Sequence, residues 1–183
     1  MNHVNINRFI RLFAGIAFAI YASYLIYYTF LDPSLGRSVI RQEIMHNTTG
    51  VDYVNLMPFK EINRFVSNIG NIRFNIILLN VVGNVVAFIP LGFLLPVITN
   101  RKLVWWSTIL IAAGASALIE VMQYVTKLGT CDIDDFILNT IGGILGYVFY
   151  RILFLIIDVI YRKRQKKANE GRIQIKAEEN YFL

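Results

Sequence analysis

The segment IILLNVVGNVVAFIPLGFLLPVI, residues 76–98, contains no charged residue and decides the class of fold. About 20 apolar residues in a row are enough to span a bilayer as a helix. Residues 9–31 and 103–126 are similarly apolar, a fourth stretch covers 133–150, and a further apolar stretch follows at 152–160. The sequence therefore predicts an all-α integral membrane bundle of four or five transmembrane helices.

The composition supports a membrane protein. The chain has 183 residues, of which 56% are hydrophobic and 14% aromatic. A soluble domain of this length could not bury so much apolar surface in one core. Its single cysteine, Cys131, excludes a framework of intramolecular disulfides.

The net charge of +6 is unevenly distributed. The basic run YRKRQKK, residues 161–167, directly follows the last apolar stretch. Basic residues that flank a span mark its cytoplasmic side and can contact anionic lipids. We therefore interpret residues 161–183 as a basic cytoplasmic tail and expect no nucleic-acid partner.

Counting back from this tail through four spans places the N-terminus in the cytoplasm as well. The loop 127–135 and the segment 32–75 then lie outside the cell. The remaining basic residues near the predicted inner ends agree with this topology; they are Arg8, Arg11, Arg101 and Lys102.

The outer segment contains an amphipathic pattern over residues 56–69. Apolar residues recur there at steps of three and four, with polar residues opposite, and Pro58 suits a first helical turn. This pattern predicts a helix that lies on the outer leaflet or covers the mouth of the bundle.

Small residues at a spacing of four predict where the helices approach one another. Such residues let helix backbones come close in lipid, where no hydrophobic force drives helices together. The three pairs are Gly83 with Ala87, Ala113 with Ala117, and Gly142 with Gly146.

Polar residues within the spans gather at one depth. At about 1.5 Å per residue from the outer boundary, Asn84, Glu120 and Asn139 lie about 13, 10 and 6 Å deep. A charged carboxylate in a span costs at least ~2.5–3.5 kcal/mol, so Glu120 should face the bundle and have a partner. The amides of Asn84, Gln123 and Asn139 are the expected donors.

The acidic start of the fourth span allows two interpretations. Asp132, Asp134 and Asp135 precede its apolar residues, and Asp134 or Asp135 could cap the helix as part of a purely structural polar core. Alternatively, the same polar layer forms a site for a ligand, a cation or a lipid headgroup. The residues alone leave both interpretations open.

Four motifs in this order and spacing resemble the VanZ-like family of bacterial membrane proteins. They are NLMPFK, GNVVAFIPLGFLLP, ALIEVMQ and DIDDFILNTIGGILGY, and the match covers about residues 50–150. The resemblance divides the chain into a first helix and outer linker (1–49), a VanZ-like membrane domain (50–160) and the tail (161–183). The positions that match the family's characteristic residues are Asn84, Phe88, Pro90, Gly92, Glu120, Gln123, Asp132, Asp135, Asn139 and Gly142.

The resemblance implies a multi-pass protein of the bacterial cell membrane and an association with resistance to the glycopeptide teicoplanin. It transfers no catalytic mechanism. Our first hypothesis is a binding protein without a cofactor, which holds the headgroup of an amphiphile in an outer-leaflet polar pocket. The amphiphile would be a lipoglycopeptide, a lipid-linked cell-wall precursor or another membrane lipid. The predicted pocket residues are Asn80, Asn84, Glu120, Gln123, Asp132, Asp135 and Asn139.

The alternative is a metal-dependent enzyme that acts on a lipid-linked envelope substrate. Its divalent cation would take oxygen ligands from Asp132, Asp134, Asp135 and Glu120, although no histidine lies near them in the sequence. A transporter would need an oligomer, because four or five helices with apolar inner halves offer no polar path. The sequence leaves the oligomeric state open.

Overall fold

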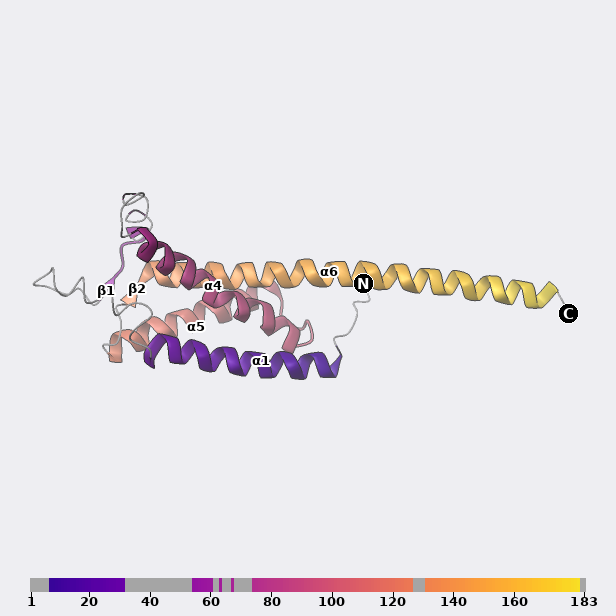
Figure 1. The fold of residues 1–183 in the computed structure, drawn as a ribbon, viewed down its shortest axis with the longest axis horizontal. Coiled ribbons are helices and arrows are strands. Elements are labelled where there is room, and N and C mark those ends of the chain that lie inside the picture. The colour runs from indigo at the N-terminus through magenta and orange to yellow at the C-terminus, as the bar shows by residue number, and fades with distance from the viewer. Residues whose placement is uncertain are drawn as a thin grey trace, which may run out of the picture.

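The computed structural model describes residues 7–31, 54–60, 63, 67, 74–126 and 131–181, and only the main chain of residues 31, 74–80 and 175–181. Four helices in this part are long and apolar enough to cross a membrane, which confirms the predicted all-α membrane bundle. The elements in chain order are α1 (Arg8–Ile26) with a π-helical continuation η1 (Tyr27–Leu31), β1 (Val54–Asn55), α4 (Phe74–Ile98), α5 (Trp105–Thr126), β2 (Cys131–Asp132) and α6 (Ile133–Tyr181) (Figure 1).

Helix α6 is longer than the sequence pattern predicts. The prediction was a span that ends near residue 150, followed by a separate segment at 152–160, but the structure has one helix as far as Tyr181. Its last part extends beyond the other helices (Figure 1). No proline interrupts α6, and the Lys, Arg, Glu and Gln residues of the tail are good helix formers. The basic tail is therefore a continuation of the fourth membrane helix.

Helices α4 and α6 pack backbone against backbone at the predicted GxxxG. A Cβ atom on Gly142 or Gly146 would collide with a main-chain carbonyl oxygen of α4, that of Val85 or Ile89 respectively. Gly92 of α4 meets the main chain of α6 in the same way. Only glycine permits this approach, so the prediction for Gly142 and Gly146 is confirmed.

The other two small-residue predictions are corrected by the structure. Nothing lies within 4 Å of a Cβ built on Gly83, so this glycine forms no close helix contact among the described residues. On α5 the fully buried small residues are Ala112 and Ser116, one position before the predicted Ala113 and Ala117. Both registers have small residues four apart, so spacing alone could not choose between them.

Two side-chain bonds tie α1 to α4. The Tyr21 hydroxyl donates to the Ala87 carbonyl at 2.8 Å, and Arg11 Nε donates to the Ile98 carbonyl at 3.0 Å. The second bond places a cation at the C-terminus of α4, where it also complements the helix dipole. Helix α1 thus lies along the outside of the bundle, and most of its side chains are exposed to the lipid.

A short parallel bridge marks one end of the bundle. Val54 pairs with Cys131 and Asn55 with Asp132, where β1 meets β2 beside the start of α6 (Figure 1). We call this the strand end, and we call the opposite end, at the α4–α5 link, the Arg101 end. The predicted amphipathic helix at 56–69 lies mostly outside the described residues, as does the predicted linker up to residue 49.

Candidate functional site

Polar side chains of α4, α5 and α6 meet at the strand end. Five of them are at most 5% exposed, although they belong to the most hydrophilic residue types. Two others, on α4 and β2, are half-buried. We call this set the polar cluster: Asn84, Glu120, Gln123, Asp132, Asp134, Asp135 and Asn139. The side chain of Asn80, the remaining predicted residue, lies outside the described part of the chain.

Asp132 caps the start of α6. Its Oδ1 accepts a hydrogen bond from the Asp134 main-chain N–H at 2.9 Å, and its own N–H donates to Glu120 Oε2 at 2.9 Å. The prediction that Asp134 or Asp135 is the cap was wrong. A capping side chain precedes the first helical residue, and α6 begins at Ile133.

The acidic start of α6 also binds the segment 54–60. Asp134 Oδ1 accepts the main-chain N–H of Phe59 at 2.5 Å, and Asn55 Nδ2 donates to Asp132 Oδ2 at 3.0 Å. Phe59 has a φ of 65°, a left-handed conformation that is costly for a bulky residue and persists only where its surroundings hold it. The bond to Asp134 therefore fixes the segment that contains the NLMPFK motif over the cluster.

Inside the bundle, two amides make bonds that differ from the expected ones. Asn84 Nδ2 donates to Asp135 Oδ1, and Asn139 Nδ2 donates to Ser116 Oγ at 3.0 Å. That these amides also donate to Glu120 stays a prediction. The cap geometry brings a main-chain N–H to Glu120, which a sequence pattern cannot show.

Sequence reasoning missed three members of this site. Ser116 lies four residues before Glu120, on the same face of α5, and this spacing could have identified it. Asn55 and Phe59 carry no such signal, because their contacts depend on how the segment 54–60 folds back onto β2. The structure thus adds the segment 54–60 to the predicted helix residues of this site.

The cluster creates a negative electrostatic environment around the only cysteine. Burial raises the pKa of the Cys131 thiol, and the negative charges of Glu120 and Asp132 raise it further. Cys131 is half-buried and lies outside the helices, directly before the capping aspartate. The negative environment at this place favours positive charge and hydrogen-bond donors.

The carboxylates are not arranged as ligands of one metal ion. Within the part of the chain that the structure describes, no group of three or more His, Cys, Asp and Glu side chains could hold a metal. Both oxygens of Asp132 and the Oδ1 atoms of Asp134 and Asp135 accept hydrogen bonds from N–H groups. The metal-dependent enzyme therefore gains no support from the described geometry.

Comparison with known proteins identifies the family of this chain. The VanZ/LLP1 family profile matches residues 18–155, about three-quarters of the chain. Protein VanZ of Enterococcus faecium is 32% identical over 97 residues, which are 53% of this chain and 52% of that protein. The chain thus spans about half the length of this curated relative, and no solved structure matches it. The membrane protein described here belongs to the VanZ/LLP1 family.

Proposed function

We propose that this protein contributes to glycopeptide resistance, or to a related envelope function, by binding the headgroup of an amphiphile at the polar cluster. One observation carries the proposal: five buried polar side chains from α5 and α6 converge at one end of a membrane bundle. Carboxylates are costly at membrane depth and commonly mark functional sites. The family's association with teicoplanin suggests a lipoglycopeptide as the first ligand to test.

The proposal includes an orientation in which the strand end faces outward. The basic residues of the Arg101 end and of the α6 tail support a cytoplasmic location for both termini. A membrane-impermeant maleimide should then label Cys131 in intact cells, without permeabilisation. Labelling that appears only after the membrane is opened would place the cluster on the cytoplasmic side and contradict the proposal.

The chemistry of the cluster favours certain headgroups. Asp132 and Asn84 are its half-buried members and are the groups that a ligand would reach first. A headgroup with an amine or several hydroxyl groups would complement the carboxylates, and its acyl chain would remain in the outer leaflet. A lipoglycopeptide, a lipid-linked cell-wall precursor and an amine-bearing phospholipid all combine these two parts.

Substitution of Glu120 tests the role of charge in the cluster most directly. Glutamine has nearly the same shape and keeps an oxygen that can accept the Asp132 N–H, so Glu120→Gln removes the charge and preserves the cap contact. The matched control is Glu170→Gln on the exposed part of α6, where the carboxylate lies 3.9 Å from Lys166 in a solvated i,i+4 pair. Both variants change the same residue type in the same way.

The test is the minimum inhibitory concentration of teicoplanin for a susceptible host that expresses each form. Wild type and Glu170→Gln should raise this concentration, and Glu120→Gln should return it to the level of the empty vector. Immunoblots of the membrane fraction must show equal amounts of all three proteins. Full resistance with Glu120→Gln at equal protein levels would refute a role for the charged cluster.

A further inference from the structure

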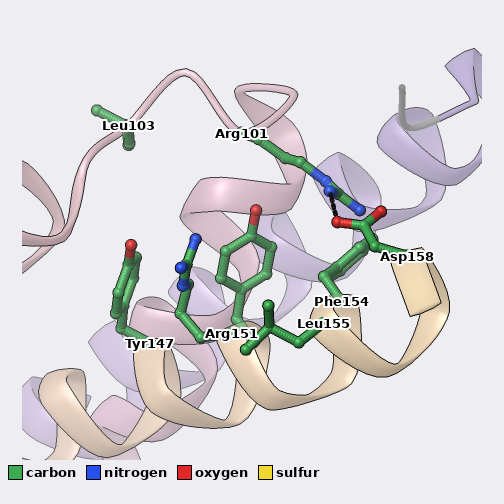
Figure 2. A pocket seen from close by; sticks show the side chains of 8 residues that line it. Arg101, Leu103, Tyr147, Arg151, Phe154, Leu155 and Asp158 are labelled. Carbon is green, nitrogen blue, oxygen red and sulfur yellow. Dashed lines mark hydrogen bonds and ion pairs between the residues drawn. The ribbon is translucent and has the colours of Figure 1, made fainter. Parts of the chain in front are cut away.

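A second polar site lies at the Arg101 end, outside the polar cluster. A cavity of about 80 Å³ opens there between the α4–α5 link and α6 (Figure 2). A single water needs roughly 10–15 Å³ of such space, so the cavity has room for a larger polar group. Besides two leucines, it is lined by Arg101, Tyr147, Tyr150, Arg151, Phe154 and Asp158.

Arg101 is held firmly at this cavity. Its Nη1 donates to Asp158 Oδ2 at 2.8 Å, and its guanidinium carbon lies 4.5 Å from the centre of the Phe154 ring. The side chains of Arg101 and Asp158 are only 14% and 8% exposed. The ion pair and the ring contact together fix the plane of the guanidinium.

The main chain around Arg101 is fixed as well. Asn100 and Arg101 have φ values of 55° and 65°, and their N–H groups donate to the carbonyls of Val97 and Pro96 at 3.1 and 2.8 Å. These two bonds form a Schellman motif at the end of α4, with Asn100 at the usual glycine position. Arginine rarely adopts a left-handed conformation, and such positions concentrate at ligand-binding sites.

The Arg101 guanidinium retains hydrogen-bonding capacity. Its Nε and Nη2 are buried and have no hydrogen-bond partner among the described residues. A buried donor without a partner is unfavourable, so an acceptor in the cavity would stabilise this arrangement. Asp158 uses only one of the two guanidinium edges.

A second guanidinium faces the same space. Figure 2 shows the polar ends of Arg151 and Tyr147 on the side of α6 that faces the link with Leu103. Arg151 makes no hydrogen bond or ion pair with the described part of the chain, unlike Arg101. Two arginines and one aspartate give the lining a positive balance, which favours an anion.

The cavity lies where one leaflet's headgroups would be. Arg151 and Asp158 are 18 and 25 residues beyond Ile133, or about 27 and 38 Å along α6 at about 1.5 Å per residue. The hydrocarbon core is about 30 Å thick, so these two residues flank its far boundary from the strand end. We propose that this cavity binds a phosphate group of net negative charge, carried by an anionic lipid headgroup or free in solution, between the guanidinium groups of Arg101 and Arg151. Planar guanidinium groups match phosphate oxygens in a bidentate geometry.

The two tryptophans provide a local probe. Trp105 and Trp106 are the only tryptophans of the chain, are exposed, and begin α5 just after the link that carries Arg101. Full-length protein is reconstituted into phosphatidylcholine vesicles that contain either brominated phosphatidylglycerol or brominated phosphatidylcholine, at 0.15 M salt. The wild type should show a several-fold stronger quenching per mole of the anionic lipid. Equal quenching by both lipids, together with no effect of inorganic phosphate on the emission, would overturn the proposal.

Variants separate the cavity from general surface charge. Arg151→Gln breaks no described bond and should abolish the preference for the anionic lipid, whereas Arg164→Gln, on the exposed part of the same helix, should keep it. Arg101→Gln should also abolish it, but this variant loses the ion pair with Asp158 and is secondary. An equal loss in Arg151→Gln and Arg164→Gln, or full preference in Arg151→Gln, would overturn the proposal.

The source of the phosphate is decided by competition. Millimolar inorganic phosphate is added to wild-type protein in neutral phosphatidylcholine vesicles and, separately, in the vesicles that contain brominated phosphatidylglycerol. A saturable change in tryptophan emission that Arg151→Gln lacks would identify free phosphate as a ligand. A preference for the anionic lipid that phosphate does not reduce would identify the lipid headgroup. Both results support the same phosphate chemistry.

Discussion

Replacing Gly146 by alanine should destabilise the protein by forcing α4 and α6 apart. A Cβ atom at this position would collide with the Ile89 carbonyl oxygen and would lie 2.9 Å from Phe93 N and 3.0 Å from the Ile89 carbonyl carbon. All three are main-chain atoms, which cannot rotate away as a side chain could. The substitution is therefore accommodated only by a shift of one helix against the other.

The expected magnitude follows from two opposing effects. Overpacking of a tight contact costs about 1–3 kcal/mol. Alanine also has a better helix propensity than glycine, by about 0.8–1.0 kcal/mol in a helix interior. Gly146→Ala should therefore lower the free energy of unfolding by up to about 2 kcal/mol. Gly114→Ala on α5 is the matched control, because nothing lies within 4 Å of its Cβ and only the propensity gain remains.

The assay is unfolding in mixed micelles by titration with sodium dodecyl sulfate, followed by the emission of the two tryptophans. Gly146→Ala should unfold at a lower detergent fraction than wild type, and Gly114→Ala at an equal or higher one. If both alanine variants were stabilised to the same extent, α4 and α6 would not be in backbone contact, and the described interface would be refuted.

Two further predictions concern charged groups. Asp158→Asn should lower the free energy of unfolding by about 3–5 kcal/mol, because it leaves the mostly buried guanidinium of Arg101 without its carboxylate. The double variant with Arg101→Gln should lose less free energy of unfolding than the sum of the two single variants. A simple sum in the same unfolding titration would contradict the ion pair. For Cys131, burial and the nearby negative charges raise the pKa of the thiol. The fraction of thiolate, the form that reacts, is therefore smaller at any given pH. The rate of alkylation should then rise at a pH above ~8.5, the ordinary pKa of a cysteine thiol. Glu120→Gln removes one of those charges and should shift the rate profile to lower pH; an unchanged profile would show that Glu120 does not act on this thiol.

The sequence predicts the helices well because membrane spans depend on local composition. Helices α4 and α5 begin and end within about two residues of the predicted 76–98 and 103–126. The end of α6 was missed, because the change from apolar to charged residues marks the membrane boundary and not the end of a helix. The charged residues beyond 160 continue the helix outside the apolar region.

The sequence also predicts which polar residues gather, but not how they pair. Counting along the helices places Glu120 and Asn139 in the same polar layer, and both are buried at the strand end. Their partners depend on the tertiary contact between β1 and β2 and on the first residue of α6, which decides that Asp132 is the cap. Neither feature has a periodic signature.

The contacts of the Arg101 site also have no periodic signature in the sequence. The pairing of Arg101 with Asp158 joins residues 57 positions apart, and it requires α6 to continue past the fourth span. A fourth span that ends near residue 150 would leave Asp158 in a separate segment, and the sequence gives no reason to pair it with Arg101. Long-range ion pairs of this kind follow from the length and direction of helices, which composition fixes only in part.

The most direct test of the central claim is a binding titration at the polar cluster. Cys131 is labelled at alkaline pH with an environment-sensitive fluorophore, and the full-length protein in lipid nanodiscs is titrated with teicoplanin. The proposed headgroup site predicts a saturable change in emission that Glu170→Gln retains and Glu120→Gln loses. No saturable change in the wild type, or the same change in Glu120→Gln, would contradict binding at the cluster.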